Sequence, residues 1–273
     1  MESLFCCPIC GGALERDQES CHCGRGHSFD LAREGYVNLL PVNRRHSKAP
    51  GDDRKMVQAR SRFLDGGWYA PLRDELWRLF DRYVPQDAPQ VLDAGCGEGY
   101  YTEALAARAL ARHGRLAGVD ISKSAVKRAA KRCPGAEFAV GSVYRLPLGK
   151  ESVDALVDCF SPLAAEEFHR VLRPGGVFFY VVPGPRHLWE MKEVLYETPY
   201  ENQEKMECYQ GFTYREVVPV EGRFTLTDPQ DIQALFHMTP YAWKTPKAGV
   251  ARLMGRAQLH VSVQFRIHIM ERL

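Results

Sequence analysis

The sequence predicts an α/β protein in which a mostly parallel sheet carries helices on both faces and an antiparallel last strand, with a small N-terminal module added to it. Three observations predict this fold. Continuous apolar runs alternate with amphipathic helical patterns between residues 90 and 196, as in parallel sheets that are covered on both faces. The segment QLHVSVQFRIHIM (258–270) alternates with a period of two, as an antiparallel strand does. Five of the nine cysteines lie within residues 6–23, outside this pattern.

A length of 273 residues accommodates one large α/β domain and a small appendage. The hydrophobic content of 45% and charged content of 26% are ordinary globular values, and a formal net charge of +2 does not indicate a partner by itself. No apolar run approaches the roughly 20 residues that span a bilayer, and the N-terminus lacks the pattern of a signal peptide. We therefore expect a cytoplasmic protein without membrane contact, in which clustered cysteines favour metal binding over disulfides.

The N-terminal cysteines form two short hooks, CPIC (7–10) and CGRGH (23–27), each followed or interrupted by glycine. Zn²⁺ takes four sulfur or nitrogen ligands at tetrahedral angles, and two turns with two ligands each supply them without a large core. Because such a set leaves no open coordination position, the metal is expected to be structural. The spacing predicts one zinc ion with the ligands Cys7, Cys10, Cys23 and His27.

A competing quartet consists of Cys6, Cys10, Cys21 and Cys23. It is disfavoured on the expectation that Cys21 and Cys23, with one residue between them, point apart in an extended chain. Reduced thiols in a small core are the other alternative. With the preferred quartet, Cys6 and Cys21 have no role in metal binding.

The elements of the chain follow in order. Residues 30–40 are moderately apolar and are expected to pack against the hooks. Residues 43–62 carry seven basic and two acidic side chains and predict a loop and then, after Pro50-Gly51, a helix. The pattern PLRDELWRLFDRYV (71–84) predicts an amphipathic helix. The chain is accordingly divided into a zinc-binding module (1–40), a basic connector (41–70) and a main domain (71–273).

Within the main domain, strands and helices alternate, and residues 202–225 are interpreted as an insertion plus a strand. The predicted strands are 90–95, 115–120, 137–142, 153–160, 175–183 and 258–270. The predicted helices are 101–113, 123–133, 164–172 and 186–196.

The segment DAGCGEG (93–99) lies where the first strand of this domain turns into a helix. Glycines at 95, 97 and 99 let a ligand lie against the backbone and the helix N-terminus. Asp93 is placed to meet an amino group or a bridging water, and Asp120 ends the second strand, where it could accept ribose hydroxyls. A dinucleotide-binding dehydrogenase is the alternative from the same fold, but it predicts GxGxxG, which this segment lacks.

These features, together with VLRPGG (171–176), resemble the class I S-adenosylmethionine-dependent methyltransferases. The combination of the zinc hooks, EGYVNLL (34–40), PGPRHL (183–188) and MTPYAW (238–243) resembles the bacterial large-subunit rRNA (guanine-N1)-methyltransferases over nearly the whole chain. The resemblance implies S-adenosylmethionine as cofactor and the same zinc quartet. It places cofactor contacts at Tyr69, Gly97, Glu98 and His187, and the broader superfamily places the adenine beside Ser142 and Val143.

The resemblance implies methylation of N1 of a guanine in a hairpin of 23S rRNA. Guanine N1 must lose its proton to attack, and Asp158, at the carboxyl end of the fourth strand, is the candidate base; a helix-cap or structural role is the alternative. Methylation of pyrimidine carbon 5 would need a cysteine nucleophile, and neither Cys96 nor Cys159 has an evident partner base. Methylation of an exocyclic amino group usually comes with an N/D-P-P-Y/F tetrad, where this chain has CFSP (159–162).

RNA phosphates are expected to contact clustered basic residues, in a cleft between the zinc module and the main domain. The candidates are Arg25, Arg44, Arg45 and Lys48. A homodimer would enlarge this contact. The alternatives are a methyltransferase that acts on a small molecule or another RNA, and a non-catalytic RNA-binding protein. The complete set of Asp93, the glycines and Asp120 favours an enzyme.

Overall fold

The computed structural model describes residues 2–41, 50–204 and 206–273, which form two sheets. The N-terminal sheet is antiparallel and has the order β1-β2-β3-β4. Its strands are β1 (Glu2–Cys6), β2 (Ala13–Arg16), β3 (Ser20–Cys23) and β4 (Ser28–Asp30). The turn from β1 to β2 and the turn from β3 to β4 carry the two hooks. Arg44, Arg45 and Lys48 lie outside the described residues.

The second sheet has eight strands in the order β11-β12-β10-β9-β6-β7-β8-β5. Their bounds are β5 (Tyr36–Asn38), β6 (Gln90–Ala94), β7 (Arg115–Asp120), β8 (Glu137–Val140), β9 (Val153–Cys159), β10 (Leu172–Pro183), β11 (Phe212–Leu226) and β12 (Leu259–Arg272). Strands β5 to β10 pair in parallel, and β12 is antiparallel to both of its neighbours. The predicted mostly parallel sheet with an antiparallel last strand is confirmed.

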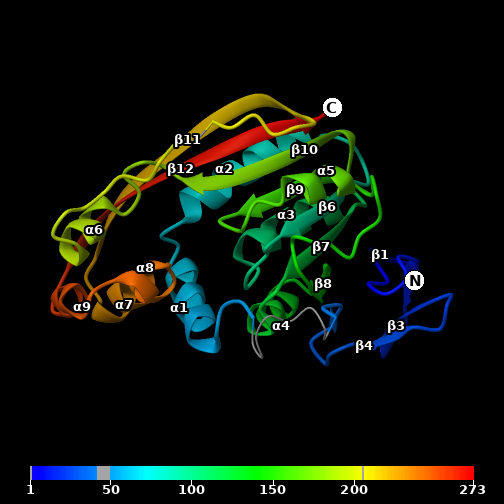
Figure 1. Ribbon diagram of the computed structural model, residues 1–273, viewed down its shortest axis with the longest axis horizontal. Coiled ribbons are helices and arrows are strands. Elements are labelled where there is room, and N and C mark those ends of the chain that lie inside the picture. Colours follow the sequence, from blue (N-terminus) through cyan, green and yellow to red (C-terminus); the bar gives the residue numbers. More distant parts are fainter. Residues whose placement is uncertain (1, 42–49, 205) are drawn as a thin grey trace.

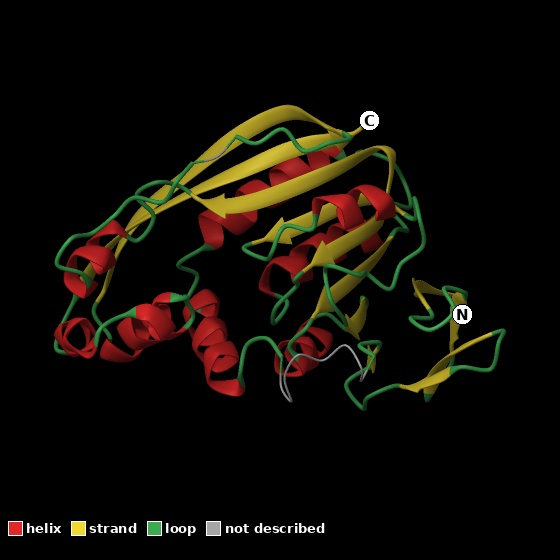
Figure 2. Ribbon diagram, in the orientation of Figure 1, coloured by secondary structure: helices red, strands yellow, loops and turns green. Residues whose placement is uncertain are grey.

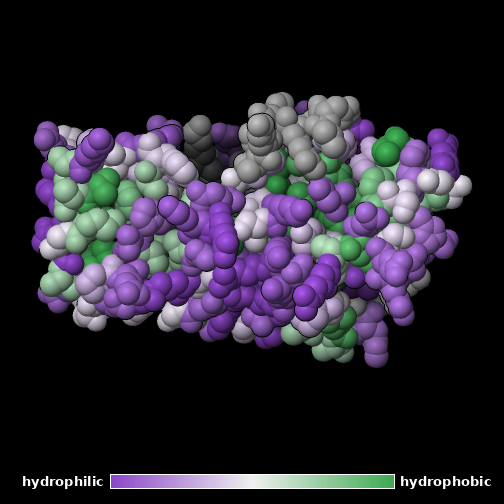
Figure 3. Space-filling model, turned by 90° about the horizontal axis from the view of Figure 1, so that it is seen from below, coloured by the Kyte–Doolittle hydropathy of each residue, from purple (hydrophilic) through white to green (hydrophobic). Residues whose placement is uncertain are grey.

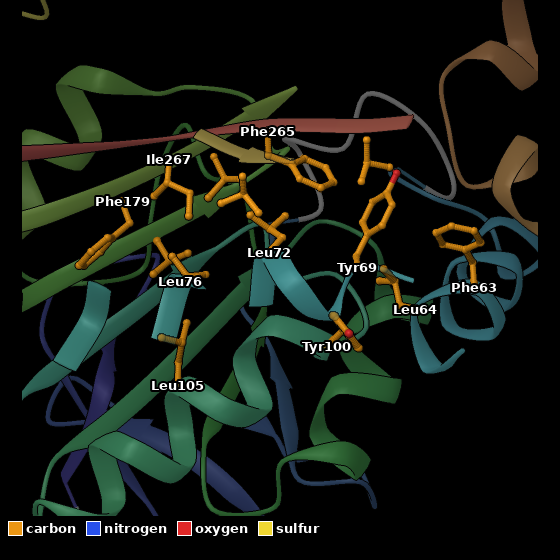
Figure 4. Packing of buried hydrophobic residues seen from close by; sticks show 14 of the residues in the cluster. Phe63, Leu64, Tyr69, Leu72, Leu76, Tyr100, Leu105, Phe179, Phe265 and Ile267 are labelled. Atoms are coloured by element: carbon orange, nitrogen blue, oxygen red, sulfur yellow. The ribbon is translucent and has the colours of Figure 1, made fainter. Parts of the chain in front are cut away.

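Helices cover both faces of this sheet (Figure 2). They are α1 (Arg54–Asp65), α2 (Ala70–Tyr83), α3 (Tyr100–Ala111), α4 (Lys123–Arg132), α5 (Ala165–Val171), α6 (Trp189–Leu195), α7 (Pro229–His237), α8 (Tyr241–Lys244) and α9 (Lys247–Met254). The strands alternate in the direction of their side chains, so Val157 packs with α2 and α3 on one face and Leu156 packs with α5 on the other. Figure 4 shows the core that contains Val157, with Leu105 and Phe265 among its labelled residues.

Residues 30–40 pack against the hooks as expected, because Val37 and Leu39 lie in one buried cluster with Cys7 and Cys23. Strand β5 also joins the large sheet, which the sequence did not predict. It pairs with β8 at the edge of the large sheet, and Leu39 N–H donates to the Val140 carbonyl at 2.9 Å. Phe5 and Leu14 of the N-terminal sheet join the same buried cluster as Leu92 of β6. The N-terminal sheet is therefore fastened to the main domain by shared core, while the division at residues 40 and 70 stays a prediction.

Strands β11 and β12 form a long hairpin of 15 and 14 residues whose far end carries α6 to α9 (Figure 1). The N-terminal sheet lies at the opposite end of the molecule (Figure 1). Helix α7 packs against α1, which lies in the segment predicted to be the basic connector. Among the described residues, none of the helices has both the length and the apolar character that crossing a membrane requires.

Candidate cofactor site and metal centre

The glycine turn after β6 is held in a conformation that favours glycine. The φ angles of Gly95, Gly97 and Gly99 are 84°, 54° and 90°. A Cβ on Gly95 would lie 2.2 Å from Ser161 Oγ, and one on Gly99 would lie 2.9 Å from Ala129 Cα. Gly97 has only the Arg60 guanidinium nearby, at 3.9 Å. The outer two glycines thus serve the packing of the chain itself, and Gly97 presents bare backbone to a ligand.

Three acidic side chains surround this turn, which lies at the carboxyl ends of β6 and β7. Asp120 accepts the N–H of Gly97 at 3.0 Å through Oδ2 and the N–H of Ser122 at 2.7 Å through Oδ1. Asp93 accepts the hydroxyl of Thr102 at 2.6 Å, and burial raises the pKa of Asp93 to about 7. These contacts fix the two carboxylates that the sequence placed at the cofactor.

Glu98 is only 2% exposed, and its Oε1 has no hydrogen-bond partner within the described part of the chain. Burial raises the pKa of Glu98. An unpaired buried carboxylate oxygen beside bare backbone is an acceptor site for a donor from outside the chain. S-adenosylmethionine carries an ammonium group and ribose hydroxyls, all of them donors, so the residues present fit this cofactor.

Tyr69 and His187, which are 118 residues apart, meet beside the turn, with Tyr69 Oη 3.3 Å from His187 Nε2. His187 Nδ1 accepts the backbone N–H of Gln264 at 3.3 Å, so Nε2 carries the ring hydrogen and donates to the tyrosine oxygen. The Tyr69 hydroxyl hydrogen is then free for a ligand. Both rings pack on Phe265, with centroid distances of 4.9 and 4.8 Å, and Figure 4 shows Tyr69 beside Phe265.

The buried imidazole makes the stability of the protein dependent on pH. Burial lowers the pKa of His187 from 6.5 to about 3, so the folded protein binds fewer protons than the unfolded chain between these values. The stability contribution is complete above pH 6.5 and is lost as the pH falls toward 3, at up to about 1.4 kcal/mol per pH unit. We expect His187→Gln to remove this part of the pH dependence. Urea denaturation at several pH values checks it: the wild-type curve should fall more steeply than the variant curve, whereas parallel curves would contradict a neutral buried His187.

Ser142 and Val143 follow β8, where the N–H of Gly141 donates to the Asp120 carbonyl at 3.0 Å. The loop is thereby tied to the end of β7, next to the acid predicted to bind ribose. Val143 is buried and Ser142 is half-buried. Their contact with adenine stays a prediction, as do the cofactor roles of the other residues around the turn.

Asp158 is the last residue but one of β9, and its side chain is fully buried. Its Oδ1 accepts the N–H of Ser161 at 3.0 Å, its Oδ2 has no partner among the described residues, and burial raises its pKa well above the ordinary value. The neighbouring Cys159 packs with the core that holds Tyr69, so alternation along the strand directs Asp158 to the opposite face. The hydrogen bond fits the structural alternative, and a role as base stays a prediction.

The two hooks bring four ligand atoms to within 4.8 Å of one another, and the residues are Cys7, Cys10, Cys23 and His27. Cys10 Sγ and Cys23 Sγ are 3.7 Å apart, and His27 Nδ1 lies 3.5 Å from Cys7 Sγ and 3.4 Å from Cys23 Sγ. A zinc tetrahedron with its usual bond lengths has S···S and S···N edges of about 3.8 and 3.6 Å. The site therefore has the dimensions of a Cys3His zinc centre with Nδ1 as the histidine ligand, as the spacing predicts.

The reason given against the competing quartet is wrong, although the quartet chosen is right. Residues two apart in a strand share a face, and Cys21 and Cys23 of β3 are both buried, at 1% and 5% exposure. Both lie in one buried cluster with Phe5 and Leu14. What separates them is the position of the sulfur: Cys23 ends β3 where the chain turns toward His27, and its Sγ belongs to the group of close ligand atoms, whereas that of Cys21 does not. Burial raises the pKa of Cys21, which keeps it a neutral thiol.

Sequence reasoning missed Arg60, which it counted only as part of the basic connector. In the structure Arg60 pairs with Asp52, and its guanidinium lies over Gly97. Arg62 likewise pairs with Asp228 and Asp231, each at 2.7 Å. The partner of Arg60 lies in the same basic connector, whereas the partners of Arg62 are 166 and 169 positions away. No local pattern could therefore have shown that the charge of Arg62 is neutralised. Arg25, in contrast, is exposed on the second hook.

Comparisons with known proteins match both parts of the chain. A family model for the RlmA N-terminal zinc ribbon matches residues 5–48, and a model for a methyltransferase domain matches residues 91–176. A predicted 23S rRNA (guanine-N1)-methyltransferase of Bacillus subtilis is 33% identical over 98% of this chain and 96% of its own length. The 23S rRNA (guanine(748)-N1)-methyltransferase of Streptomyces fradiae is 39% identical over 69% of this chain and 66% of its own length. A predicted enzyme of the same kind from Micromonospora griseorubida is 37% identical over 69% and 68%. The chain therefore belongs to the RlmA-type 23S rRNA (guanine-N1)-methyltransferases, with an N-terminal zinc ribbon and a class I methyltransferase domain.

Proposed function

We propose that this protein methylates N1 of a guanine in a hairpin of 23S rRNA with S-adenosylmethionine as donor. The observation that carries the proposal is that one chain holds both the Cys3His centre and the glycine turn. Relatives named for this reaction match this chain. When bound, the cofactor would supply a methyl group on a sulfonium, from which an attacking nitrogen takes the methyl in line while the sulfur leaves as a thioether. Because this reaction needs no covalent intermediate between enzyme and RNA, positioning of the two reactants supplies much of the rate enhancement.

The residues of this chain divide the work of binding and orientation. In this proposal Asp120 accepts the ribose hydroxyls. It is supported by the two hydrogen bonds that hold its oxygens, from Gly97 and Ser122, since each oxygen retains a lone pair. Glu98 and the hydroxyl of Tyr69 supply one further acceptor and one further donor beside the turn. Tyr69, His187 and Phe265 form an aromatic cluster through mutual ring contacts.

RNA binding draws on a basic surface made by the neighbouring helices α1 and α4. The middle of the molecular face in Figure 3 is hydrophilic. The exposed basic side chains of these helices are Arg54, Lys55, Arg62, Lys123, Lys127, Arg128 and Lys131. Arg62 pairs with Asp228 and Asp231, and Lys127 and Lys131 share Glu34 as acidic partner at 3.1 and 3.9 Å. Phosphate contacts of this kind give affinity without base specificity. A cytoplasmic location and a homodimer, which would offer two such surfaces, belong to the same proposal.

The proposal predicts one missing modification. We expect 23S rRNA from cells that lack the gene to lose one N1-methylguanine that is present in the parent strain. Mass spectrometry of nuclease fragments would identify the base, and complementation with the wild-type gene would restore it. Unchanged rRNA together with binding of S-adenosylmethionine by the purified protein would point to a different substrate, and an absence of such binding would contradict an enzymatic role.

A further inference from the structure

The residue after β9, Phe160, combines two unfavourable features. Its φ angle is 61°, in the left-handed region that side-chain-bearing residues rarely adopt, and its side chain is 43% exposed. A left-handed backbone costs roughly 1–2 kcal/mol at a residue other than glycine, and an exposed aromatic ring forgoes the benefit of burial. Strain that persists in this way tends to occur at functional sites.

The surrounding structure holds Phe160 in this conformation from both sides. Its own N–H donates to the Val181 carbonyl at 3.1 Å, and the next residue, Ser161, donates its N–H to Asp158 Oδ1 at 3.0 Å. Ser161 also packs directly on Gly95, where a Cβ would come within 2.2 Å of its hydroxyl oxygen. The turn that presents Phe160 is therefore built against the glycine turn of the cofactor site.

The ring of Phe160 borders the cofactor cluster and reaches the solvent. Its centroid is 5.7 Å from that of Phe265, the ring on which Tyr69 and His187 pack. Phe160 also follows the carboxyl end of β9, and this is the edge at which ligands bind in open α/β sheets. The Phe160 ring thus lies between the aromatic cluster at the cofactor site and the solvent.

We propose that Phe160 is the platform on which the target guanine stacks. The inference rests on the proposed function, because a guanine to be methylated at N1 must leave any Watson–Crick pair, and an unpaired base is held by stacking on an aromatic side chain. Phe160 has no polar atom, so it would hold the base without selecting it. Its role would be to set the plane of the ring so that the N1 edge faces the methyl group.

Four variants separate stacking from a structural role. Phe160→Leu keeps an apolar side chain without a flat face, and Phe160→Gly removes the ring while relieving the left-handed strain. We expect both to lower kcat/KM for methylation of 23S rRNA from cells lacking the gene, by roughly 10- to 100-fold, as base–aromatic stacking predicts. S-adenosylmethionine affinity by calorimetry should stay unchanged. Phe160→Tyr and Phe160→Trp should restore activity to within about 3-fold, since both retain an aromatic face.

Leu110→Ala is the matched control, because Leu110 is also 43% exposed and lies at the end of α3, at the amino edge of the sheet. It should leave both readouts at wild-type values. Full activity of Phe160→Leu, or loss of cofactor affinity in step with activity, would overturn the stacking role while leaving the guanine-N1 activity in place. Failure of the wild-type protein to methylate any guanine would instead contradict the proposed function.

Discussion

Replacing Gly95 with alanine is expected to weaken cofactor binding strongly and to slow methyl transfer. The added Cβ would lie 2.2 Å from Ser161 Oγ and 2.3 Å from Ser161 Cβ, at a φ of 84°. Relief requires movement of the glycine turn, of the Ser161 turn or of both, and each of them borders the cofactor site. We expect binding of S-adenosylmethionine to weaken at least ~100-fold, because misplacement of a binding group by about 1 Å can cost this much in rate. Calorimetry and a methyl-transfer assay on rRNA measure the two effects.

Two further variants show whether the overlap or the backbone conformation is responsible. Gly175 has a similar φ of 75°, but a Cβ there would meet no heavy atom within 4 Å. Gly175→Ala should therefore lose roughly 1–2 kcal/mol of folding free energy and keep its cofactor affinity. The double variant Gly95→Ala/Ser161→Gly removes both overlapping atoms and should recover part of the binding. A double variant no better than Gly95→Ala would show that the contact with Ser161 is not the cause.

The main domain could be predicted from the sequence because its signals are local. Each strand from β6 to β10 is a continuous apolar run, and the glycines at 95, 97 and 99 must lie in a turn because their spacing allows neither a helix nor a strand to continue. Parallel pairing then places Asp93 and Asp120 at one edge of the sheet. The zinc ligands were predictable for the same reason, since each hook lies within five consecutive residues.

The rest depends on contacts between distant segments. Strand β5 has three residues, too few for a periodic signal, and only its pairing with β8 makes it a strand. Tyr69 and His187 meet across 118 residues, and the sequence shows neither their hydrogen bond nor the ring of Phe265 between them. The helices α7 to α9 had no prediction, because their short apolar patterns are fixed by packing on α1 and α6. In the sequence, Phe160 is part of CFSP, where an N/D-P-P-Y/F tetrad is missing, and its unusual φ angle and exposed ring are seen only in the structure.

The zinc centre provides the second large effect. Replacing Cys23 with serine should release the metal, because a serine hydroxyl is a poor ligand where zinc requires a thiolate. Although burial raises the pKa of Cys23, the backbone N–H groups of Arg25 and His27 outweigh this effect and bring the pKa to about 6, so the thiolate is available at neutral pH. Structural zinc in small modules is worth roughly 10–16 kcal/mol of apparent binding free energy. We expect the metal content of the variant, measured by mass spectrometry, to fall from about one ion per chain to below about 0.1.

Loss of the metal should affect methylation of rRNA and binding of S-adenosylmethionine differently. The N-terminal sheet is small, and without zinc its few buried side chains, among them Phe5 and Leu14, must hold it against the main domain alone. Methylation of rRNA should therefore be lost, whereas binding of S-adenosylmethionine should persist, because Gly97 and Asp120 belong to the large sheet. Cys21→Ala is the matched control: it removes a buried thiol from the same strand and should retain zinc. Retention of zinc by Cys23→Ser, or its release by Cys21→Ala, would mean that Cys21 rather than Cys23 belongs to the quartet.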